Sequence, residues 1–404
     1  MANIRKRGNS YQIRVSAGYR ADGTQISRSK TWTPEPGMTE RQIEKELNRQ
    51  AVIFEEECRN GHIGGAIRFE VFAEQWFEEY AKKNLRNTTY SFMRHLRERV
   101  YKAIGHLSMD KITVRQLQVF INSLSEEGAN EANGKALSPK SVRHILSFIS
   151  DIFSYAVRME VVSDNPCHRV ILPKIQKAEK KIYTPEEVRT LMGYLEHEDI
   201  RYRACFMLMI FTGCRRGEIM GLEWKDFDFE SCIVNIRRTS CYTPSRGIYT
   251  DTTKTEQSKR VLKIPREVAD VLIELREWQN RRAELLGDKW TDCDRLFTKE
   301  HGEPQQPNMP YKWLERFCRE HDIPFYGLHA FRHLFASLLV SNGVDIVTVS
   351  GMLGHSSVST TGNIYCHVIE ETRVRAADTV SAALGFGAGD NGQTMDTADI
   401  CVKK

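Results

Sequence analysis

Long apolar runs are missing from this chain of 404 residues. Its most hydrophobic stretch, Ala204 to Phe211, is far shorter than the roughly 20 residues that a membrane helix needs. The first residues, MANIRKRGNS, carry charges without an apolar stretch behind them, so no secretory signal is expected. Internal repeats are absent as well. These absences argue against a membrane protein and predict a soluble chain of two or three globular domains.

Paired metal ligands are also missing. Ten cysteines are present, but no two of them form a C-x-x-C pair, so a zinc site is not expected. Unpaired thiols are typical of the reducing cytoplasm. No pair of acids stands out as ligands for Mg²⁺, which disfavours a metal-dependent nuclease. The sequence thus predicts a cytoplasmic protein that needs no metal and no cofactor.

Positive charge is concentrated at one end of the chain. The formal net charge is +5, whereas residues 1–34 alone carry seven basic side chains against the single acid Asp22, a net +6. Such a cluster predicts binding to a polyanion, most commonly DNA, although a solvated charged terminus is the alternative interpretation. The seven are Arg5, Lys6, Arg7, Arg14, Arg20, Arg28 and Lys30.

The same end predicts a small sheet-plus-helix module. Residues 10–17 and 24–33 are rich in strand-forming residues, and an Asp-Gly pair between them is typical of a hairpin turn. Arg28 and Lys30 are two apart and so project from one face of their strand. Prolines end the strand before a polar helix. We expect a three-stranded sheet and a helix over residues 1–65, with Gly61, Gly64 and Gly65 as a hinge.

Residues 66–165 carry apolar side chains at helical spacing, which predicts an all-helical domain with these stripes as its core. Thr113 and Gln116 form a capping box ahead of a further helix. The stripes are Phe69, Phe72, Trp76 and Tyr80, then Val142, Ile145, Leu146, Ile149, Phe153 and Ala156.

A basic linker is predicted over residues 166–182, because lysines outnumber acids in its second half. These lysines would contact a duplex backbone and make binding fall with salt. They are Lys174, Lys177, Lys180 and Lys181.

A third domain is predicted over residues 183–385. Thr184 and Glu187 form its opening capping box, with proline at the first helical position. The pattern then indicates helix, a β-rich region between Cys232 and Pro265, and helix again. The tail, 386–404, has little to bury and is expected to be mobile.

Four short segments of the third domain carry residues suited to chemistry. Each segment alone is weak evidence for a functional site. An H-x-x-R pair is usually a surface pair, an arginine after a glycine is usually a helix-start feature, and a hairpin lysine is usually an edge residue. The segments are TGCRRGEI (212–219) with Arg215 and Glu218, TKTEQSKR (253–260) with Lys254 near the tip of an expected hairpin, LHAFRHLFAS (328–337) with His329, Arg332 and His333, and LGHSSVSTTGNIYCHV (353–368) with His355 and Tyr365.

Taken together, these side chains indicate chemistry on a phosphodiester. Two arginines offer planar forks that match its non-bridging oxygens. Two histidines can donate hydrogen bonds or move protons near neutral pH, and a lysine among cations can protonate a leaving alkoxide. A tyrosine can be the nucleophile in a sufficiently cationic setting.

The order Arg215, Lys254, His329-x-x-Arg332, His355, Tyr365 resembles the tyrosine recombinases, and among them the integrases of phages and conjugative transposons. The resemblance is strong over about 180–370, weaker over 66–163 and weakest over 1–60. It implies a multidomain fold, mainly α with β: an arm-binding sheet-plus-helix module, an all-helical core-binding domain and a mixed α/β catalytic domain. One departure is Leu334, where many relatives have threonine; we expect it to be harmless.

By this resemblance, Tyr365 attacks a scissile phosphate to form a 3′-phosphotyrosyl bond and a free 5′-hydroxyl, without ATP or metal. Arg215 and Arg332 would clamp the non-bridging oxygens, and Lys254 would be the general acid. His329 would accept the tyrosine proton or hold the tyrosine hydroxyl, and His355 would donate a hydrogen bond to the phosphate. Glu218 would orient Arg215, and His333 would support the site.

The resemblance also implies partners and a setting. A bacterial, nucleoid-associated homotetramer on core and arm DNA sites is expected, monomeric when free, with an excision factor and a host DNA-bending protein as further partners. The segment Glu370 to Leu384 would be core or, as we favour, would dock on a neighbouring protomer. Resolvases, invertases or type IB topoisomerases with the same chemistry, and a catalytically silent DNA-binding relic, are the alternatives.

Overall fold

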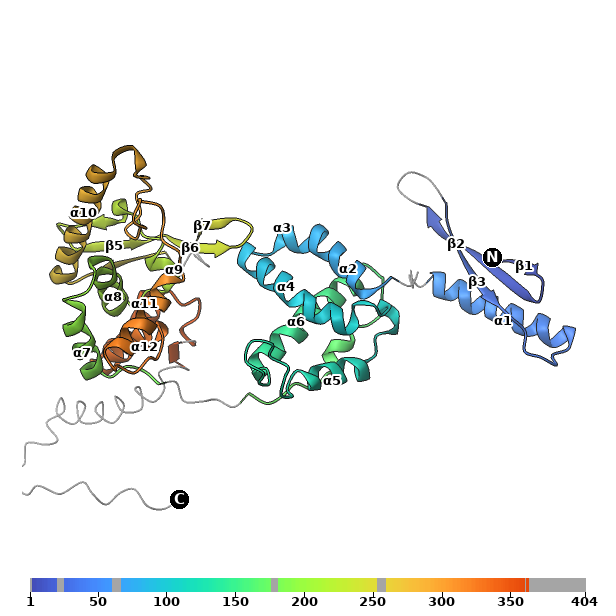
Figure 1. Ribbon diagram of the computed structural model, residues 1–404. Helices are drawn as coiled ribbons and strands as arrows, with labels where there is room; N and C mark the ends of the chain where they lie inside the picture. The colour runs from blue at the N-terminus through green and yellow to red at the C-terminus, as the bar shows by residue number, and fades with distance from the viewer. Residues whose placement is uncertain are drawn as a thin grey trace, which may run out of the picture. The chain divides into compact units, whose positions relative to one another are not determined.

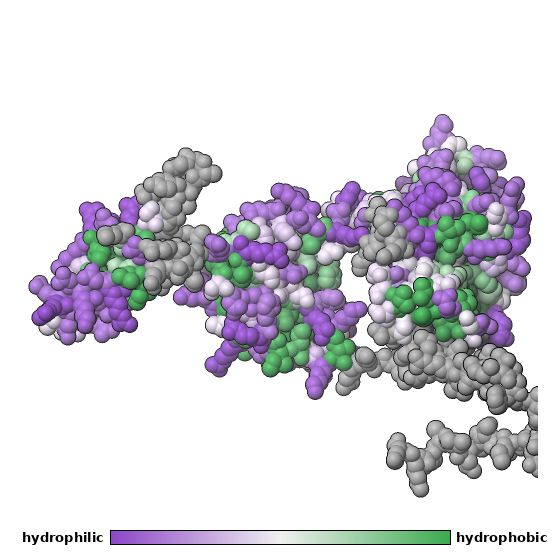
Figure 2. Space-filling view, turned by 180° about the vertical axis from the view of Figure 1, so that it is seen from behind, coloured by the Kyte–Doolittle hydropathy of each residue, from purple (hydrophilic) through white to green (hydrophobic). Residues whose placement is uncertain are grey.

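The computed structural model describes residues 2–19, 25–59, 67–175, 181–252, 259–359 and 361–362 (Figure 1). The chain divides into two compact units, residues 1–178 and 179–404. Within the described ranges no helix is both long and apolar enough to cross a bilayer. Figure 2 shows hydrophilic residues over most of the visible surface of each unit, with smaller apolar patches between them.

Several predicted features fall outside the described residues. They are the Asp-Gly turn, the hinge glycines Gly61, Gly64 and Gly65, two linker lysines (Lys177 and Lys180), two site residues (Lys254 and Tyr365), the segment Glu370 to Leu384 and the tail 386–404. The five-part division of the chain stays a prediction.

A three-stranded antiparallel sheet opens the first unit. Its order is β1 (Asn3–Arg7), β2 (Ser10–Tyr19) and β3 (Gln25–Trp32), and helix α1 (Glu40–Arg59) follows. Because strand side chains alternate between faces, one face of the sheet is apolar. Ile13 on that face is fully buried and packs with Leu47 and Ala51 of α1. These three residues form a small core that is separate from the others.

Helices make up the rest of the first unit, as expected. Thr113 caps α5 in a capping box with Gln116, and the predicted stripes are buried except for the half-buried Tyr80. The helices are α2 (Phe69–Trp76), continued by the π-helical turn η1 (Phe77–Ala81) and by α3 (Lys82–Asn84), then α4 (Asn87–Val100), α5 (Val114–Ser123) and α6 (Pro139–Arg158).

The second unit combines helices with two small sheets, of which the two-stranded one projects from the helices (Figure 1). Its helices are α7 (Pro185–Leu195), α8 (Ile200–Thr212), α9 (Arg216–Ile219), α10 (Arg266–Leu286), α11 (Met309–Glu320), α12 (His329–Ser341) and α13 (Ile346–Leu353). Its strands are β4 (Phe227–Asp228), β5 (Ile233–Ile236), β6 (Arg238–Thr243), β7 (Gly247–Thr252) and β8 (Arg260–Lys263).

The strands on either side of Lys254 pair differently from the prediction. β7 pairs with β6, whereas β8 pairs with β5 in the separate sheet β4-β5-β8. The described ladders therefore contain no hairpin between β7 and β8, and the expected hairpin over 251–260 is wrong. Leu262 of β8 is buried in the core of the second unit, and the local sequence pattern does not reveal which strand β8 pairs with there.

Candidate active site

Arg215 is placed by the turn between α8 and α9. α8 ends at Gly213, whose φ of 58° lies in the left-handed region and whose added Cβ would meet Phe335 at 2.6 Å, so only glycine fits. Arg215 is the N-cap of α9, and its backbone N–H donates to Glu218 Oε2 at 2.8 Å. Its Nη1 donates to Glu218 Oε1 at 2.8 Å. Glu218 therefore orients Arg215, as expected from their spacing.

Arg332 lies one turn into α12 and is only 5% exposed. Its Nη1 donates to the Gly213 carbonyl at 2.9 Å and its Nη2 to the Leu353 carbonyl at 2.8 Å. Arg215 Nη2 donates to the next carbonyl, Gly354, at 3.0 Å. The two arginines thus bind the C-terminal ends of α8 and α13, where helices leave carbonyls without intrahelical partners.

Burial governs the electrostatics of this pair. Burial lowers the pKa of Arg332 to about 10, and the charge of Arg215 acts in the same direction. Arg332 still carries its proton at neutral pH. The repulsion between the two guanidinium groups is partly offset by Glu218, and a bound phosphate would offset it further.

A third arginine, which the sequence analysis missed, completes the cluster. Arg260, at the start of β8, donates from Nη2 to Glu218 Oε2 at 2.8 Å and lies 3.1 Å from Cys214 Sγ. Burial alone would raise the pKa of Glu218, but the hydrogen bonds and charges of Arg260 and Arg215 together outweigh it, so the pKa is lowered. Three arginines around one carboxylate leave two net positive charges.

His355 follows α13 directly. Its backbone N–H donates to the Ser350 carbonyl at 3.1 Å, and its Nδ1 lies 2.7 Å from the hydroxyl of the fully buried Thr361. The pKa of His355 is lowered to about 4, mainly by burial and in addition by the charges of Arg332 and Arg215. The imidazole is therefore neutral at pH 7, and when Thr361 donates to Nδ1, the proton on Nε2 is available to a ligand.

The remaining predicted residues are placed less completely. His329 is the exposed first residue of α12, one turn before Arg332. His333 is close enough to His355 to contribute to lowering its pKa. The structure thus brings Arg215, Glu218, Arg332 and His355 together.

Two residues of this site escaped the sequence analysis. Arg260 had a signal, because it lies two residues before Leu262, and residues two apart on a strand project from the same face. Thr361 had none, because it is one of several hydroxyl residues in SSVSTT and only the fold selects it.

A second basic surface lies on the N-terminal sheet. Strand pairing places Asn3 opposite Arg14 and Arg5 opposite Gln12, so Arg5, Arg7 and Arg14 share the face away from α1. These side chains line a hollow of about 540 Å³ with Ser27 and Ser29. Arg14 donates from Nε and Nη2 to the Ser27 hydroxyl, at 3.1 and 2.7 Å.

Two lysines of the predicted DNA-binding set lie on the other face. Lys6 pairs with Tyr11, and its Nζ lies 5.7 Å from the centre of that ring. Lys30 pairs with the buried Ile13, and its Nζ lies 3.5 Å from Gln50 of α1. Arg14 and Lys30 therefore cannot act together from one face. Arg28 pairs with Val15; Lys174 and Lys181 are exposed.

A cluster of arginines, two of them buried, beside a neutral imidazole is the kind of site that handles a phosphodiester. Residues 181–372 match the model of the Phage integrase family, and residues 68–125 match that of the phage integrase N-terminal SAM-like domain. A tyrosine recombinase XerC-like protein of Caldanaerobacter subterraneus is 30% identical over 283 residues, 66% of this chain and 70% of that protein. The ICEBs1 integrase of Bacillus subtilis is 26% identical over 369 residues, 91% of this chain and 96% of that protein.

Solved structures share the fold. The Tn1549 transposon integrase in complex with a circular intermediate DNA has a TM-score of 0.63 at 17% identity, over 77% of this chain and 99% of that one. A lambda integrase dimer bound to a COC′ core site, and a lambda integrase tetramer bound to a Holliday junction, each have a TM-score of 0.54 at 15% identity, over 90% of this chain and 94% of theirs.

The chain belongs to the phage integrase family of tyrosine recombinases. It is a site-specific recombinase, an enzyme that breaks and rejoins DNA. The family, the fold class and the enzyme class expected from the four motifs are confirmed.

Proposed function

We propose that the protein integrates and excises a mobile genetic element by cutting and rejoining DNA through a 3′-phosphotyrosyl intermediate. The observation that carries this proposal is the convergence of Arg215, Arg332 and the neutral His355 at the ends of α8 and α13. His355 lies ten residues before Tyr365 in the chain. Such a cluster stabilises the extra charge of a pentacoordinate phosphorus.

The proposed first step is an in-line displacement. Tyr365 Oη bonds to phosphorus as the P–O5′ bond breaks, Lys254 protonates the leaving O5′, and His329 accepts the phenolic proton. Each guanidinium has five N–H donors, and the described hydrogen bonds of Arg332 use two nitrogens, so other N–H groups can bind the phosphate. His355 donates from Nε2 to a non-bridging oxygen, and His333 supports it.

The proposed partners are core-type and arm-type DNA sites bound by a homotetramer that assembles from free monomers. The lambda integrase relatives bound to a core site and to a Holliday junction support this assembly. The segment from Glu370 to Leu384 would dock on a neighbouring protomer. An excision factor and a host DNA-bending protein would determine whether integration or excision is favoured. The reaction would take place on the bacterial nucleoid.

Arm-type DNA would be bound by the sheet face that carries Arg5, Arg7 and Arg14. This face is polar and exposed, and β-ribbons of this size enter a major groove. Lys174 and Lys181 would contact core-site phosphates, as would Lys177 and Lys180. A recombinase with separate arm and core surfaces is an integrase rather than a simple resolvase or invertase.

A covalent-trapping experiment tests the proposal. The protein first selects its core-site duplex from a random-sequence pool, and a nicked version of that duplex is then incubated with it in EDTA and without ATP. We expect a protein–DNA adduct on a denaturing gel, and Tyr365→Phe should bind the duplex equally well without forming it. An adduct from Tyr365→Phe would refute the assignment of the nucleophile. Plasmid relaxation without strand exchange would favour the topoisomerase alternative.

A further inference from the structure

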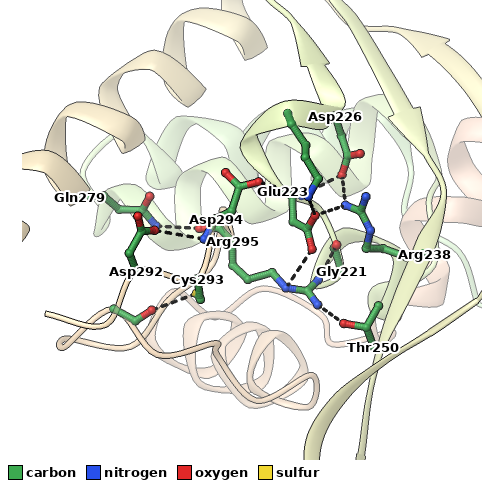
Figure 3. A network of polar contacts seen from close by, with 12 residues as sticks. Gly221, Glu223, Asp226, Arg238, Thr250, Gln279, Asp292, Cys293, Asp294 and Arg295 are labelled. Carbon is green, nitrogen blue, oxygen red and sulfur yellow. Dashed lines mark hydrogen bonds and ion pairs between the residues drawn. The ribbon is translucent and has the colours of Figure 1, made fainter.

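A second buried charged network lies beside the β6–β7 hairpin (Figure 3). Glu223 Oε2 accepts from Arg238 Nη1 at 2.9 Å, and Arg238 also contacts Asp226, which is 1% exposed. Arg295, which is 7% exposed, has its Nε 3.8 Å from Glu223 Oε1. Lys225 also pairs with Glu223 and Asp294. The three cations and the three acids balance one another, so this network, unlike the active-site cluster, has no excess charge for a phosphate.

Arg295 connects two parts of the unit that matter for catalysis. Its Nη1 donates to the Gly221 carbonyl, two residues after α9, the helix capped by Arg215. Its Nη2 donates to the Thr250 hydroxyl in β7. Figure 3 shows the guanidinium of Arg295 lying between Glu223, Gly221 and Thr250. One buried side chain therefore holds β7 against the chain that leaves α9.

Glycines allow β6 to approach α9 just as closely. A Cβ at Gly217 would lie 2.4 Å from the Thr239 hydroxyl, and one at Gly221 would lie 3.0 Å from the Ser240 amide nitrogen. Side chains at these two positions would push the hairpin away from α9. The close approach and the Arg295 bridge together fix β6–β7 relative to Arg215.

The position of Arg295 is itself determined by α10. Gln279 Nε2 donates to the carbonyls of Arg295 and Leu296, at 3.1 and 2.9 Å, and its Oε1 accepts from Trp224 Nε1 at 2.8 Å. An isolated β-bridge pairs Glu223 with Arg295. Buried hydrogen bonds of this kind favour one geometry, because breaking one of them leaves a buried polar group unpaired.

We propose that Arg295 is a positioning residue for the protonation of the leaving 5′-oxygen. By holding Thr250 against Gly221, it sets the point from which the chain leaves β7, and Lys254 follows the last residue of β7, Thr252, by two positions. Arg295 does not touch the DNA; it acts through the strand that leads to the general acid. The inference rests on the proposed role of Lys254.

Leaving-group chemistry separates this role from a merely structural one. In the cleavage step the electron pair of the P–O5′ bond goes to O5′, which takes a proton from Lys254 Nζ. If sulfur replaces O5′, the group leaves as a thiolate, and because thiols ionise with a pKa of about 8.5 it needs no proton. Cleavage of the sulfur substrate therefore depends on Tyr365 and the arginines but not on Lys254.

The experiment compares cleavage of matched core-site duplexes with oxygen or sulfur at the bridging 5′ position, using the full chain. Arg295→Lys keeps a charge beside Glu223 but cannot bridge Gly221 and Thr250, and Thr250→Val removes only the hydroxyl that Arg295 binds. The control is Thr243→Val in the same hairpin, because within the described part of the chain the buried Thr243 hydroxyl has no hydrogen-bond partner.

We expect oxygen-substrate cleavage to fall about 10- to 100-fold in Arg295→Lys and about 3- to 10-fold in Thr250→Val, as for a misplaced catalytic group. Cleavage of the sulfur substrate by both variants should stay within about 3-fold of the wild-type rate. This change is much smaller than the loss of rate that a misplaced catalytic group causes. Equal losses on both substrates in Thr250→Val, or no loss on either, would overturn the proposal, even if Arg295→Lys fails to fold. If sulfur does not rescue Lys254→Ala, the role of Lys254 fails instead, which is a separate result.

Discussion

Two arginine clusters in this protein differ in their exposure to solvent and in their hydrogen-bond partners. Arg5, Arg7 and Arg14 are exposed on the sheet face of the first unit, and the described partner of Arg14 is a serine hydroxyl. Arg215 and Arg332 in the second unit are held by backbone carbonyls, and Arg332 is buried. Exposed arginines can adapt to a DNA groove, whereas buried ones are fixed before the substrate arrives.

The difference shows how one residue type serves two purposes. Surface cations attract DNA through its phosphates and contribute in proportion to their number. Fixed buried cations stabilise a transition state because they need no reorganisation during the reaction. The buried cluster requires Glu218 to offset its repulsion, and the exposed one is solvated instead. Four experiments test this contrast.

The largest expected effect comes from replacing a guanidinium of the active-site cluster by an ammonium, which keeps the charge but changes the shape. Arg215→Lys should lower DNA cleavage by about 10²- to 10³-fold, because a lysine cannot contact Glu218, Gly354 and a phosphate together. Core-site binding should change little. Single-turnover cleavage of a nicked duplex, with binding measured in parallel, checks this.

The matched control is Arg216→Lys, one residue further along and bonded to Asn308 instead. It should cleave nearly as fast as wild type. Near-normal cleavage by Arg215→Lys would show that the phosphate is held elsewhere.

The second effect concerns the carboxylate that holds the buried arginines. Glu218→Gln should lower the free energy of unfolding by about 3 kcal/mol, because Arg260 and Arg215 would lose a buried ionic partner. Urea unfolding of the full chain, followed by a probe in the second unit, measures it. Glu277→Gln, in an exposed pair with Arg281, should change it by less than about 0.5 kcal/mol. Equal losses of unfolding free energy in Glu218→Gln and Glu277→Gln would mean that the arginine cluster does not depend on Glu218.

The third effect is the pH dependence of the buried site. Because the pKa of His355 is lowered from 6.5 to about 4 in the folded state, the unfolded chain binds its proton first as the pH falls. The His355 contribution to stability should therefore decrease from pH 6.5 towards pH 4. Glu218, whose pKa is also lowered, loses its own contribution below its ordinary value of 4.5.

A His355→Gln variant isolates the first of these contributions. Its free energy of unfolding should vary less than that of wild type between pH 6.5 and pH 5, a range above the Glu218 transition. Parallel curves for the two proteins would show that His355 is solvated rather than buried among cations.

The smallest effect is expected on the exposed sheet face. Arg14→Ala should weaken binding to DNA that contains only arm-type sites by about 10-fold, the loss of one good groove contact. Lys6→Ala on the same sheet should weaken it less, since Lys6 lies on the α1 side with Tyr11. Fluorescence anisotropy at several salt concentrations measures both. Equal losses would mean that the polar face is not the one that reads DNA.

The sequence by itself determined the local elements and the order of the site residues. Capping boxes at Thr113 and Thr184 act within four residues, and the helical stripes follow from a period of 3.6, so both could be read directly. The pairing of Arg215 with Glu218 is equally local, because one turn of helix separates them. The six-residue order was enough to recognise the family, and nothing further was needed for the enzyme class.

Only the tertiary structure decided which distant groups meet. β7 could have paired with β8, its neighbour in the sequence, but it pairs with β6, and β8 pairs with β5. Arg260 joins the site because the fold brings Glu218 within hydrogen-bonding distance of it. Thr361 joins the site because the fold places it beside His355, after α13. Arg295 likewise becomes a bridge only between Gly221 and Thr250. The physical reason is that the burial of a charge depends on all the surfaces that enclose it, which no short stretch of sequence contains.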